Sequence, residues 1–440
     1  MHVAIITAGG AGMFCGSCMH DNAWARALQT NGTEISLIPL YTPLKLDEQS
    51  VAEQQVFLGG INVYLNTRYR WWRALPRFLQ RWVDRPRVIQ WATGFGISND
   101  ARELGELTLA TLAGTEGPLK NAIDELASHI AALKPDVVCF SNLMIAVALR
   151  SLRTSFPGPL VGILQGDDLF LDSLVEPYRS QAVGLMQKHI GVFDRLVTHS
   201  AYYRDYMANY LQFDPGRCAL LPLAIDSTPH HGLPRPRDHR PPTVGYFARI
   251  APEKGLHHLV DAMLLLQQEI PDVHLMAAGH LSKQHHGYFQ ELQLKAQPLG
   301  ARFRYHGSPA TQAEKSAFLQ KCHLLSVPAP YHEPKGLYVL EANANGIPVV
   351  QPRHGAFPEL ILSTGGGSLV DPDDPRALAE GLKHLLLNEP VRLQLATNGH
   401  RNVRANHDTT TLARKSVLLF EELLNPSSPA HTRTPAASLP

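Results

Sequence analysis

Two glutamates and a glycine lie close together in a pattern that could bind a sugar attached to a phosphate. Glu333 precedes a turn that ends at Gly336, and Glu341 follows within a helix predicted over residues 337–345. The N-terminus of a helix presents unpaired N–H groups and the positive end of the dipole, which suits a phosphate. Glycine has no Cβ, so the backbone can close on a ligand there. Carboxylates on either side could bind hydroxyls at both ends of a diphosphate, as in a nucleotide-sugar.

Two basic residues could add positive charge to the same site. Arg249 and Lys254 follow a strand predicted over residues 243–248, and Gly255 permits a turn after them. Two cations at one strand end would neutralise a diphosphate and stabilise the charge left on it as a glycosidic bond breaks. A surface turn with two solvated cations is the alternative.

Both segments resemble a known family. The run HEPKGLYVLEANANGIPVV, with Glu333 and Glu341, resembles the E-x7-E signature of the GT-B retaining glycosyltransferases of family 4, the group 1 glycosyltransferases. The run ARIAPEKG resembles the G-R-x4-K-G element of that family, with Ala248 in place of the first glycine. The resemblance is strong over residues 243–387, moderate over 133–226 and loose before that. An ordinary loop–helix–strand unit with two solvated glutamates is the alternative.

The resemblance implies an α/β fold of two Rossmann-like, doubly wound domains that face each other across a cleft. It implies transfer of a sugar from a nucleoside-diphosphate-sugar to an acceptor hydroxyl, with retention of anomeric configuration. The second domain would hold the donor, and the first would select a glycan or lipid-linked acceptor, as in glycan or cell-envelope biosynthesis. Because basic residues and a helix dipole would neutralise the diphosphate, we expect neither a metal ion nor a cofactor.

The resemblance also assigns roles to single residues. Arg249 and Lys254 would hold the diphosphate and stabilise the leaving group, and Glu333 would hold hydroxyls of the donor sugar. These three are the predicted catalytic residues, and Glu341 would bind the ribose of the donor.

The other predicted donor contacts come from both domains. Backbone N–H groups in the second domain would hold the distal phosphate, a glycine loop of the first domain would close over the donor, and a histidine would lie near the base. These residues are Gly10, Ala11, Gly12, Gln165, His306, Gly336 and Leu337.

Gln165 departs from the pattern of the family, which usually carries a histidine that contacts the donor sugar at this place. A glutamine amide can bond a sugar hydroxyl but cannot carry a proton. A sugar-nucleotide binding protein without transferase activity is therefore one alternative. A phosphorylase on the same fold is another.

Cys15 and Cys18 form a C-x-x-C pair in the first glycine loop. Such a pair at a helix start can have a lowered thiol pKa and take part in redox chemistry. No second pair completes a zinc site in the sequence. We interpret these as small residues that pack the loop against substrate, with a redox protein as the alternative.

The chain is long enough for two domains, and the pattern of strand, glycine loop and helix occurs twice. The first unit opens with a strand over residues 2–8 and a helix over 22–30. The proline- and histidine-rich run STPHHGLPRPRDHRPP reads as a linker. The predicted parts are an acceptor domain (1–226), a linker (227–242), a donor domain (243–408), a helix packing back on the first domain (409–424) and a disordered tail (425–440).

Composition narrows the class of protein. A net charge of +1 over 440 residues argues against a general nucleic-acid binder, and no apolar run is long enough to span a bilayer. Five cysteines and a first strand in place of a signal peptide predict a cytoplasmic protein. The 22 histidines predict that net charge rises steeply as the pH falls towards 6.

Residues 68–91, RYRWWRALPRFLQRWVDRPRVIQW, contain four of the five tryptophans and seven arginines. Basic and aromatic amphipathic helices suit anionic membrane surfaces or acidic acceptors. A helix that packs on the core with a solvated arginine face is the alternative. A peripheral contact with the inner face of a membrane is thus one predicted role of this segment.

Overall fold

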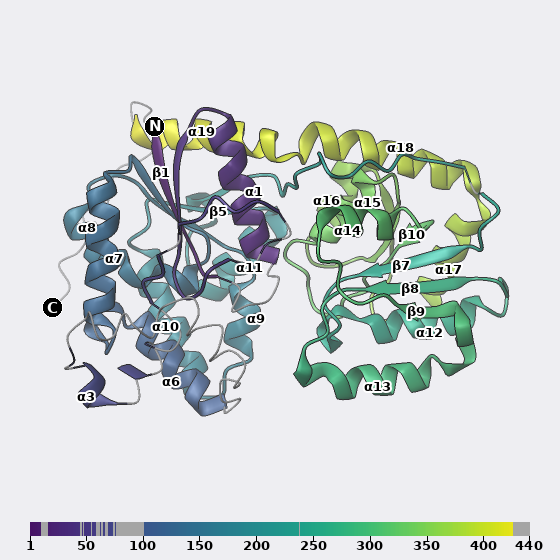
Figure 1. The fold of residues 1–440 in the computed structure, drawn as a ribbon, viewed down its shortest axis with the longest axis horizontal. Helices are drawn as coiled ribbons and strands as arrows, with labels where there is room; N and C mark the ends of the chain where they lie inside the picture. Colours follow the sequence, from purple (N-terminus) through teal and green to yellow (C-terminus); the bar gives the residue numbers. More distant parts are fainter. Residues whose placement is uncertain are drawn as a thin grey trace.

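Two parallel sheets, one in each half of the chain, form the computed structural model (Figure 1). The structure describes residues 1–9, 16–44, 46, 48–53, 55–58, 62, 65–66, 69–73, 75, 101–236 and 238–425. The first sheet has strand order β2-β1-β3-β4-β5-β6 and the second β12-β11-β10-β7-β8-β9. Helices cover both faces of each sheet (Figure 1). The predicted fold class of two doubly wound α/β domains is confirmed.

The first sheet and its helices come from the N-terminal half and from the end of the chain. Its strands are β1 His2–Thr7, β2 Glu34–Pro39, β3 Val137–Phe140, β4 Leu160–Ile163, β5 Arg195–Thr198 and β6 Cys218–Leu220. The helices are α1 Gly16–Thr30, α3 Arg70–Arg73, α6 Ala101–Leu112, α7 Lys120–Leu133, α8 Leu149–Ser155, α9 Asp167–Asp172, α10 Tyr178–Ile190, α11 Ala201–Leu211 and α19 Thr409–Leu424.

The second sheet repeats the pattern. Its strands are β7 Thr243–Phe247, β8 His274–Ala278, β9 Phe303–Tyr305, β10 Leu324–Leu325, β11 Val349–Pro352 and β12 Gly367–Val370. Its helices are α12 Leu256–Leu266, α13 His286–Lys295, α14 Gln312–Leu319, α15 Leu337–Ala344, α16 Phe357–Thr364, α17 Pro375–Leu387 and α18 Glu389–Asn406.

Strand β1 shows why these sheets are covered on both faces. Successive side chains of a strand point to opposite faces. Ala4 and Ile6 belong to one apolar cluster, and Val3 and Ile5 to the cluster on the other face. All four are fully buried, which is the pattern of a parallel strand with helices on each side.

Helix α19 returns to the first domain after the chain has built the second. It packs beside α1, where the Trp24 indole donates to Ser416 Oγ at 3.0 Å inside the core. Figure 1 shows α18 and α19 running in succession across both domains. The chain therefore crosses between the domains twice, at residues 225–242 and again near Asp408, where Ile225 and Asp408 form a parallel bridge.

Helix α1 begins at Gly16, earlier than the predicted start at residue 22. The prediction was wrong because two of the three buried residues added by this earlier start, His20 and Asp21, are polar. Asp21 is buried and accepts a hydrogen bond of 2.7 Å from the Thr7 hydroxyl. Hydrophobic periodicity cannot reveal a helical turn whose inward face is polar.

The end of the predicted helix and strand near residue 345 also differs. Helix α15 ends at Ala344, and the next strand starts at Val349, not at residue 347. Pro348 lacks an N–H for the ladder, so regular pairing with β12 begins one residue later, between Val349 and Gly367.

The predicted rise of net charge near pH 6 is not supported for many of the histidines. Burial lowers the pKa of eleven histidines among the described residues. The pKa of His189, His230 and His323 falls to about 4. His189, His230 and His323 therefore stay neutral at pH 6. The number of histidines in the sequence thus overstates how much the net charge changes.

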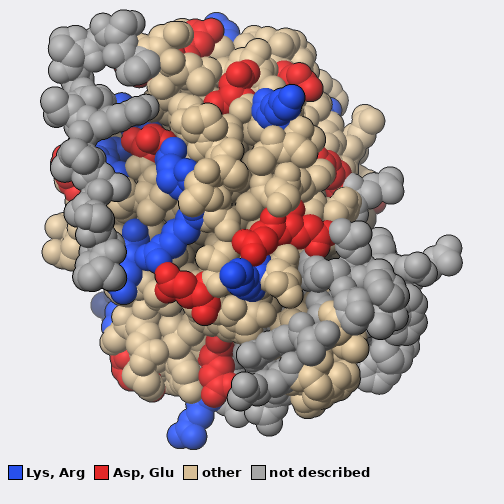
Figure 2. Space-filling model, turned by 90° about the vertical axis from the view of Figure 1, so that its left-hand side faces the viewer, with Lys and Arg blue, Asp and Glu red and all other residues tan. Residues whose placement is uncertain are grey.

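The outer side of the first domain carries both signs of charge. Figure 2 shows Lys and Arg interspersed with Asp and Glu over the described part of this face. No helix among the described residues is long and apolar enough to cross a membrane. Most of residues 68–91 and the predicted tail from residue 426 lie outside the described residues. Trp71 of α3 is 62% exposed, and a membrane contact there stays a prediction.

The packing of α19 on the first domain predicts how substitutions in this helix change the free energy of unfolding. We expect Leu412→Ala to lower the free energy of unfolding of the first domain by about 2–5 kcal/mol, because Leu412 is buried in the cluster beneath β1. Leu418→Ala is the matched control on the same helix, since Leu418 is 64% exposed. Urea unfolding followed by tryptophan fluorescence reports the first domain, because all five tryptophans lie before residue 92. Equal losses in the two variants would contradict the packing of α19 described above.

Candidate functional site

The loop between β10 and α15 carries the centre of the candidate site. Gly336 is the N-cap of α15 with φ 80° and ψ 45°, a left-handed conformation that favours glycine. No side chain caps this helix end, which leaves the backbone N–H groups available to a ligand. Gly336 and Leu337 therefore lie where the sequence analysis places a phosphate.

Glu333 is buried in this loop, and its Oε1 accepts from the backbone N–H of Lys335 at 3.4 Å. Its Oε2 accepts from Lys254 Nζ at 2.6 Å, from the Tyr331 hydroxyl at 2.6 Å and from the Tyr338 hydroxyl at 3.2 Å. Burial raises the pKa of Glu333, but the charge of Lys254 and these hydrogen bonds outweigh it and hold the pKa below its usual value. The carboxylate is therefore ionised at neutral pH.

Arg249 and Lys254 have different surroundings. Lys254 ends the 3₁₀ turn Pro252–Lys254, and its side chain is 13% exposed beside Glu333. Gly255 follows with φ 72°, and a Cβ there would lie 1.9 Å from the carbonyl oxygen of Pro328. Arg249 has a side chain that is 54% exposed and pairs with Glu253 at 3.1 Å. Lys254 is thus fixed within the site, whereas Arg249 stands at its rim.

Glu341 pairs with a lysine that the sequence analysis missed. Lys315 of α14 donates to Glu341 Oε1 at 2.9 Å, and both side chains are largely buried. Lys315 occupies an ordinary helical position, so no local signal in the sequence distinguishes it from a surface lysine. His306, predicted near the base, packs its ring on Phe318 of the same α14, with ring centres 5.8 Å apart.

Gln165 follows β4 and links the two domains. Its amide nitrogen donates to the Ser141 carbonyl at 2.5 Å and to Asp21 Oδ1 at 3.2 Å. This orients the amide oxygen towards Lys335, whose Nζ donates to it at 2.8 Å. Lys335 also donates to Ser17 Oγ at 2.9 Å. The sequence analysis named Gln165 but neither Lys335 nor Asp21 as its partner.

Two buried aspartates, Asp167 and Asp168, begin α9 shortly after Gln165. Asp167 accepts from the backbone N–H of Leu143 at 3.1 Å and of Gln165 at 3.2 Å. Burial raises the pKa of Asp167 to about 6. Burial also raises the pKa of Asp168, which accepts from the Tyr203 hydroxyl at 2.5 Å. Two buried carboxyls with raised pKa values thus lie in the first turn of α9, close to the end of β4.

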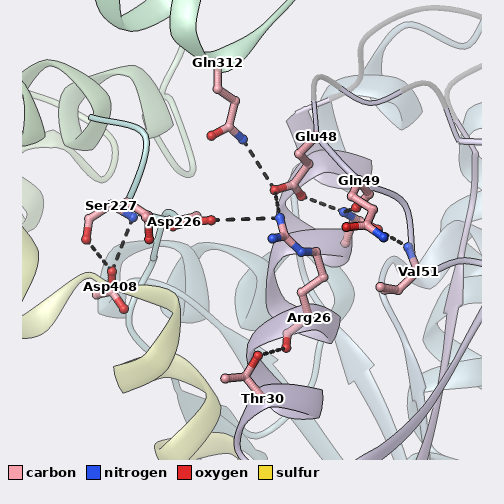
Figure 3. A network of polar contacts seen from close by, with 11 residues as sticks. Arg26, Thr30, Glu48, Gln49, Val51, Asp226, Ser227, Gln312 and Asp408 are labelled. Carbon is pink, nitrogen blue, oxygen red and sulfur yellow. Dashed lines mark hydrogen bonds and ion pairs between the residues drawn. The ribbon is translucent and has the colours of Figure 1, made fainter. Parts of the chain in front are cut away.

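A polar network of the first domain extends to α14 of the second domain. Figure 3 shows Gln312 of α14 reaching Glu48 of the first domain at 3.5 Å. Glu48 is held by Asn22 at 2.6 Å and by Arg26 at 2.5 Å. Arg26 also lies 3.9 Å from Asp226 at the first crossing of the chain.

A pocket of about 140 Å³ lies between the domains. The first domain contributes His199 and Ser200 to its wall, and the second contributes Lys335 and Glu359. Glu359 Oε1 and Oε2 accept from the first two N–H groups of α11, Tyr202 at 2.6 Å and Ala201 at 2.8 Å.

Four further residues of the sequence predictions cannot be compared with the structure. Gly10, Ala11, Gly12 and Cys15 lie outside the described residues. Cys18 is buried within α1. No group of three or more His, Cys, Asp or Glu side chains that could hold a metal ion occurs within the described part of the chain.

The family model for glycosyl transferases group 1 matches residues 234–402, which contain Lys254, both glutamates and the loop between β10 and α15 (residues 326–336), here called the donor loop. The second domain is a member of this family. The phosphatidyl-myo-inositol mannosyltransferase of Mycobacterium tuberculosis (strain ATCC 25618 / H37Rv) is 30% identical over 174 residues, which are 39% of this chain and 44% of that protein. The D-inositol 3-phosphate glycosyltransferase of Corynebacterium urealyticum is 29% identical over 199 residues, 44% of this chain and 46% of that one. These matches span less than half of either relative.

Solved structures are similar in fold to nearly the whole of this chain, and so to both of its domains. Sucrose-phosphate synthase from Thermosynechococcus elongatus superposes with a TM-score of 0.68 at 18% identity, over 97% of this chain and 100% of that one. Anabaena Alr3699/HepE, in complex with UDP and glucose, gives a TM-score of 0.66 at 16% identity, over 96% and 100%. The chain has the GT-B fold.

The raised pKa of Asp167 predicts a pH dependence. Between pH 3.8 and about 6 the folded carboxyl is protonated and the unfolded one is ionised, so stability falls as the pH rises. We expect the stability of the wild type, relative to Asp167→Asn, to fall by up to about 3 kcal/mol between pH 4 and pH 7. Urea unfolding at several pH values measures this difference. Asp272→Asn, at an exposed position, is the control, and a wild-type curve parallel to that of Asp167→Asn would contradict the prediction.

Proposed function

We propose that this protein is a retaining glycosyltransferase that moves a sugar from a nucleoside-diphosphate-sugar to an acceptor hydroxyl. The observation that carries the proposal is the buried pair of Lys254 and Glu333 beside the uncapped N-terminus of α15. A cation, a fixed carboxylate and free N–H groups in one place suit a sugar joined to a phosphate. Membership of the group 1 family and the GT-B fold support the same reaction class.

In the proposed complex the diphosphate binds at the N–H groups of Gly336 and Leu337. Lys254 and Arg249 supply positive charge, and we expect no metal ion to be required. Glu333 is ionised and can accept hydrogen bonds from hydroxyls of the donor sugar. Lys254 would then be shared between Glu333 and the charge that develops on the leaving diphosphate.

Glu341 would hold the ribose, and its pairing with Lys315 fixes the carboxylate in place. One carboxylate oxygen accepts from the lysine, which leaves acceptor capacity for the ribose hydroxyls. The structure of Alr3699/HepE contains UDP, which supports a uridine nucleotide as the first donor to test.

The acceptor would enter from the first domain. The names of the two curated relatives described above each contain an inositol compound, phosphatidyl-myo-inositol in one and D-inositol 3-phosphate in the other. We therefore propose a glycan or lipid-linked acceptor with a free hydroxyl. Contact of residues 68–91 with the surface of a membrane is part of this proposal, since it would bring a lipid-linked acceptor to the cleft.

Gln165 favours a second candidate, a sugar-nucleotide binding protein that does not transfer the sugar. Its amide is engaged on both sides, by Ser141 and Asp21 through nitrogen and by Lys335 through oxygen. Such a protein would bind the donor without turnover. The redox alternative stays a prediction, and replacing Cys15 and Cys18 by serine would separate it from a transferase that keeps its donor binding.

The first prediction concerns donor binding. We expect one of the UDP-, GDP- or ADP-sugars, at about 100 times its Kd, to raise the unfolding midpoint by roughly 5–10 °C, because ligands that bind only the native state stabilise it. The shift should vanish in Glu341→Ala and persist in Glu380→Ala, whose side chain pairs with Lys383 on the surface. A shift that survives equally in both variants would place the nucleotide elsewhere.

The second prediction concerns the chemistry. With the donor so identified, we expect Glu333→Gln to lower kcat/KM by roughly 100-fold, because a neutral amide replaces the fixed charge beside the breaking bond. The anomeric configuration of the product, read from the proton couplings in NMR spectra, should equal that of the donor. An inverted product would refute retention, and binding without any turnover would favour the second candidate.

A further inference from the structure

Glu359 joins the second domain to the first by capping a helix that is not its own. It lies in the first turn of α16, and its two oxygens accept from the N–H groups of Ala201 and Tyr202, which open α11. Ser200 Oγ accepts the next N–H, that of Tyr203. Three of the N–H groups at the start of α11 are thus satisfied, two of them by a carboxylate from the opposite domain. A negative charge at the N-terminus of a helix is a favourable contact with the helix dipole.

Lys335 makes the second joining contact, with the opposite charge. Its ammonium donates to Gln165 Oε1 and Ser17 Oγ, which lie at the end of β4 and at the start of α1. The pocket of about 140 Å³ has both Lys335 and Glu359 in its wall. The two contacts are therefore separate points around one pocket, and two points resist rotation of one domain against the other better than one.

Both contacts are rigidly connected to Glu333. Lys335 follows it by two residues. On the other side, the Ala356 N–H donates to the Glu333 carbonyl at 2.8 Å, immediately before α16 begins. Gly355 has φ 60°, and a Cβ there would come within 2.7 Å of the backbone of Glu333. Glu359, the donor loop and Lys335 thus form one body.

From this arrangement we infer that Glu359 and Lys335 are positioning residues, which hold the donor loop of the second domain against the first domain and so bring donor and acceptor together. The inference rests on the proposed function, because it assigns transfer to the cleft between the domains. When the domains separate, the hydrogen bonds between Glu359 and the N–H groups of Ala201 and Tyr202 are replaced by hydrogen bonds to water. Closure is therefore favoured by a contact from α16, outside the donor loop, and it depends on the charge of Glu359.

The test uses the full chain with Glu359→Ala, Glu359→Gln and Lys335→Met. We expect kcat to fall roughly 10- to 100-fold in Glu359→Ala, since misplacement of reacting groups by about 1 Å is enough for such losses. The donor KM should change less than about threefold, because the donor is bound by the second domain, and Glu359→Gln should lie between the alanine variant and the wild type. Small-angle X-ray scattering without substrate should give a larger radius of gyration for Glu359→Ala.

Ser200→Ala is the matched control. It removes the cap that belongs to the same domain as α11 and leaves the contacts of Glu359 and Lys335 in place. We expect Ser200→Ala to lower the unfolding temperature and to leave both the radius of gyration and kcat equal to those of the wild type. Glu359→Ala with the scattering profile of Ser200→Ala would overturn the inference, as would an expanded Glu359→Ala with unchanged kcat. Scattering needs no turnover, so it decides the question even if no nucleotide-sugar is a substrate and the proposed function fails.

Discussion

The contact between Lys254 and Glu333 is the constraint on which the rest of the site depends. A carboxylate with 6% of its side chain exposed loses its hydration, and an ion buried in this way is costly unless it is paired and hydrogen-bonded. The two tyrosine hydroxyls and the lysine meet this need. The turn at Gly255 and the turn at Gly336 must therefore approach each other closely, and both are glycines with positive φ because side chains at these points do not fit the backbone conformation.

Much of the fold could be predicted from the sequence because its signals are local. The apolar strands, the glycine turns and the spacing of Glu333 and Glu341 each lie within a few residues. The partners of the site residues could not be predicted. Lys335 and Gln165 are 170 positions apart, and Glu359 and Ala201 are 158 apart. Nothing in either neighbourhood specifies such a pairing, which arises only when two sheets are placed with their strand ends opposed.

The polar residues near the strand ends were the hardest to interpret for a related reason. Asp21 and Asp167 look like solvated residues of a loop or a helix start, yet both are buried and satisfied by a hydroxyl or by backbone N–H groups. Period-based reasoning assigns polar positions to the surface. Near the carboxyl ends of the strands in a doubly wound sheet, polar residues can instead be buried. Predictions from periodicity therefore fail most often close to the place where function is expected.

The return of α19 also has a consequence for how the protein is made. Leu412 and Phe420 fill part of the face of the first sheet that Val3 and Ile5 begin. On the ribosome this sheet is synthesised first, but one of its faces lacks these side chains until residue 420 has emerged. The second domain, in contrast, has all its strands by residue 370. The domain that is begun first is thus completed after the second sheet, and an apolar strip of its own sheet stays exposed until α19 has been made.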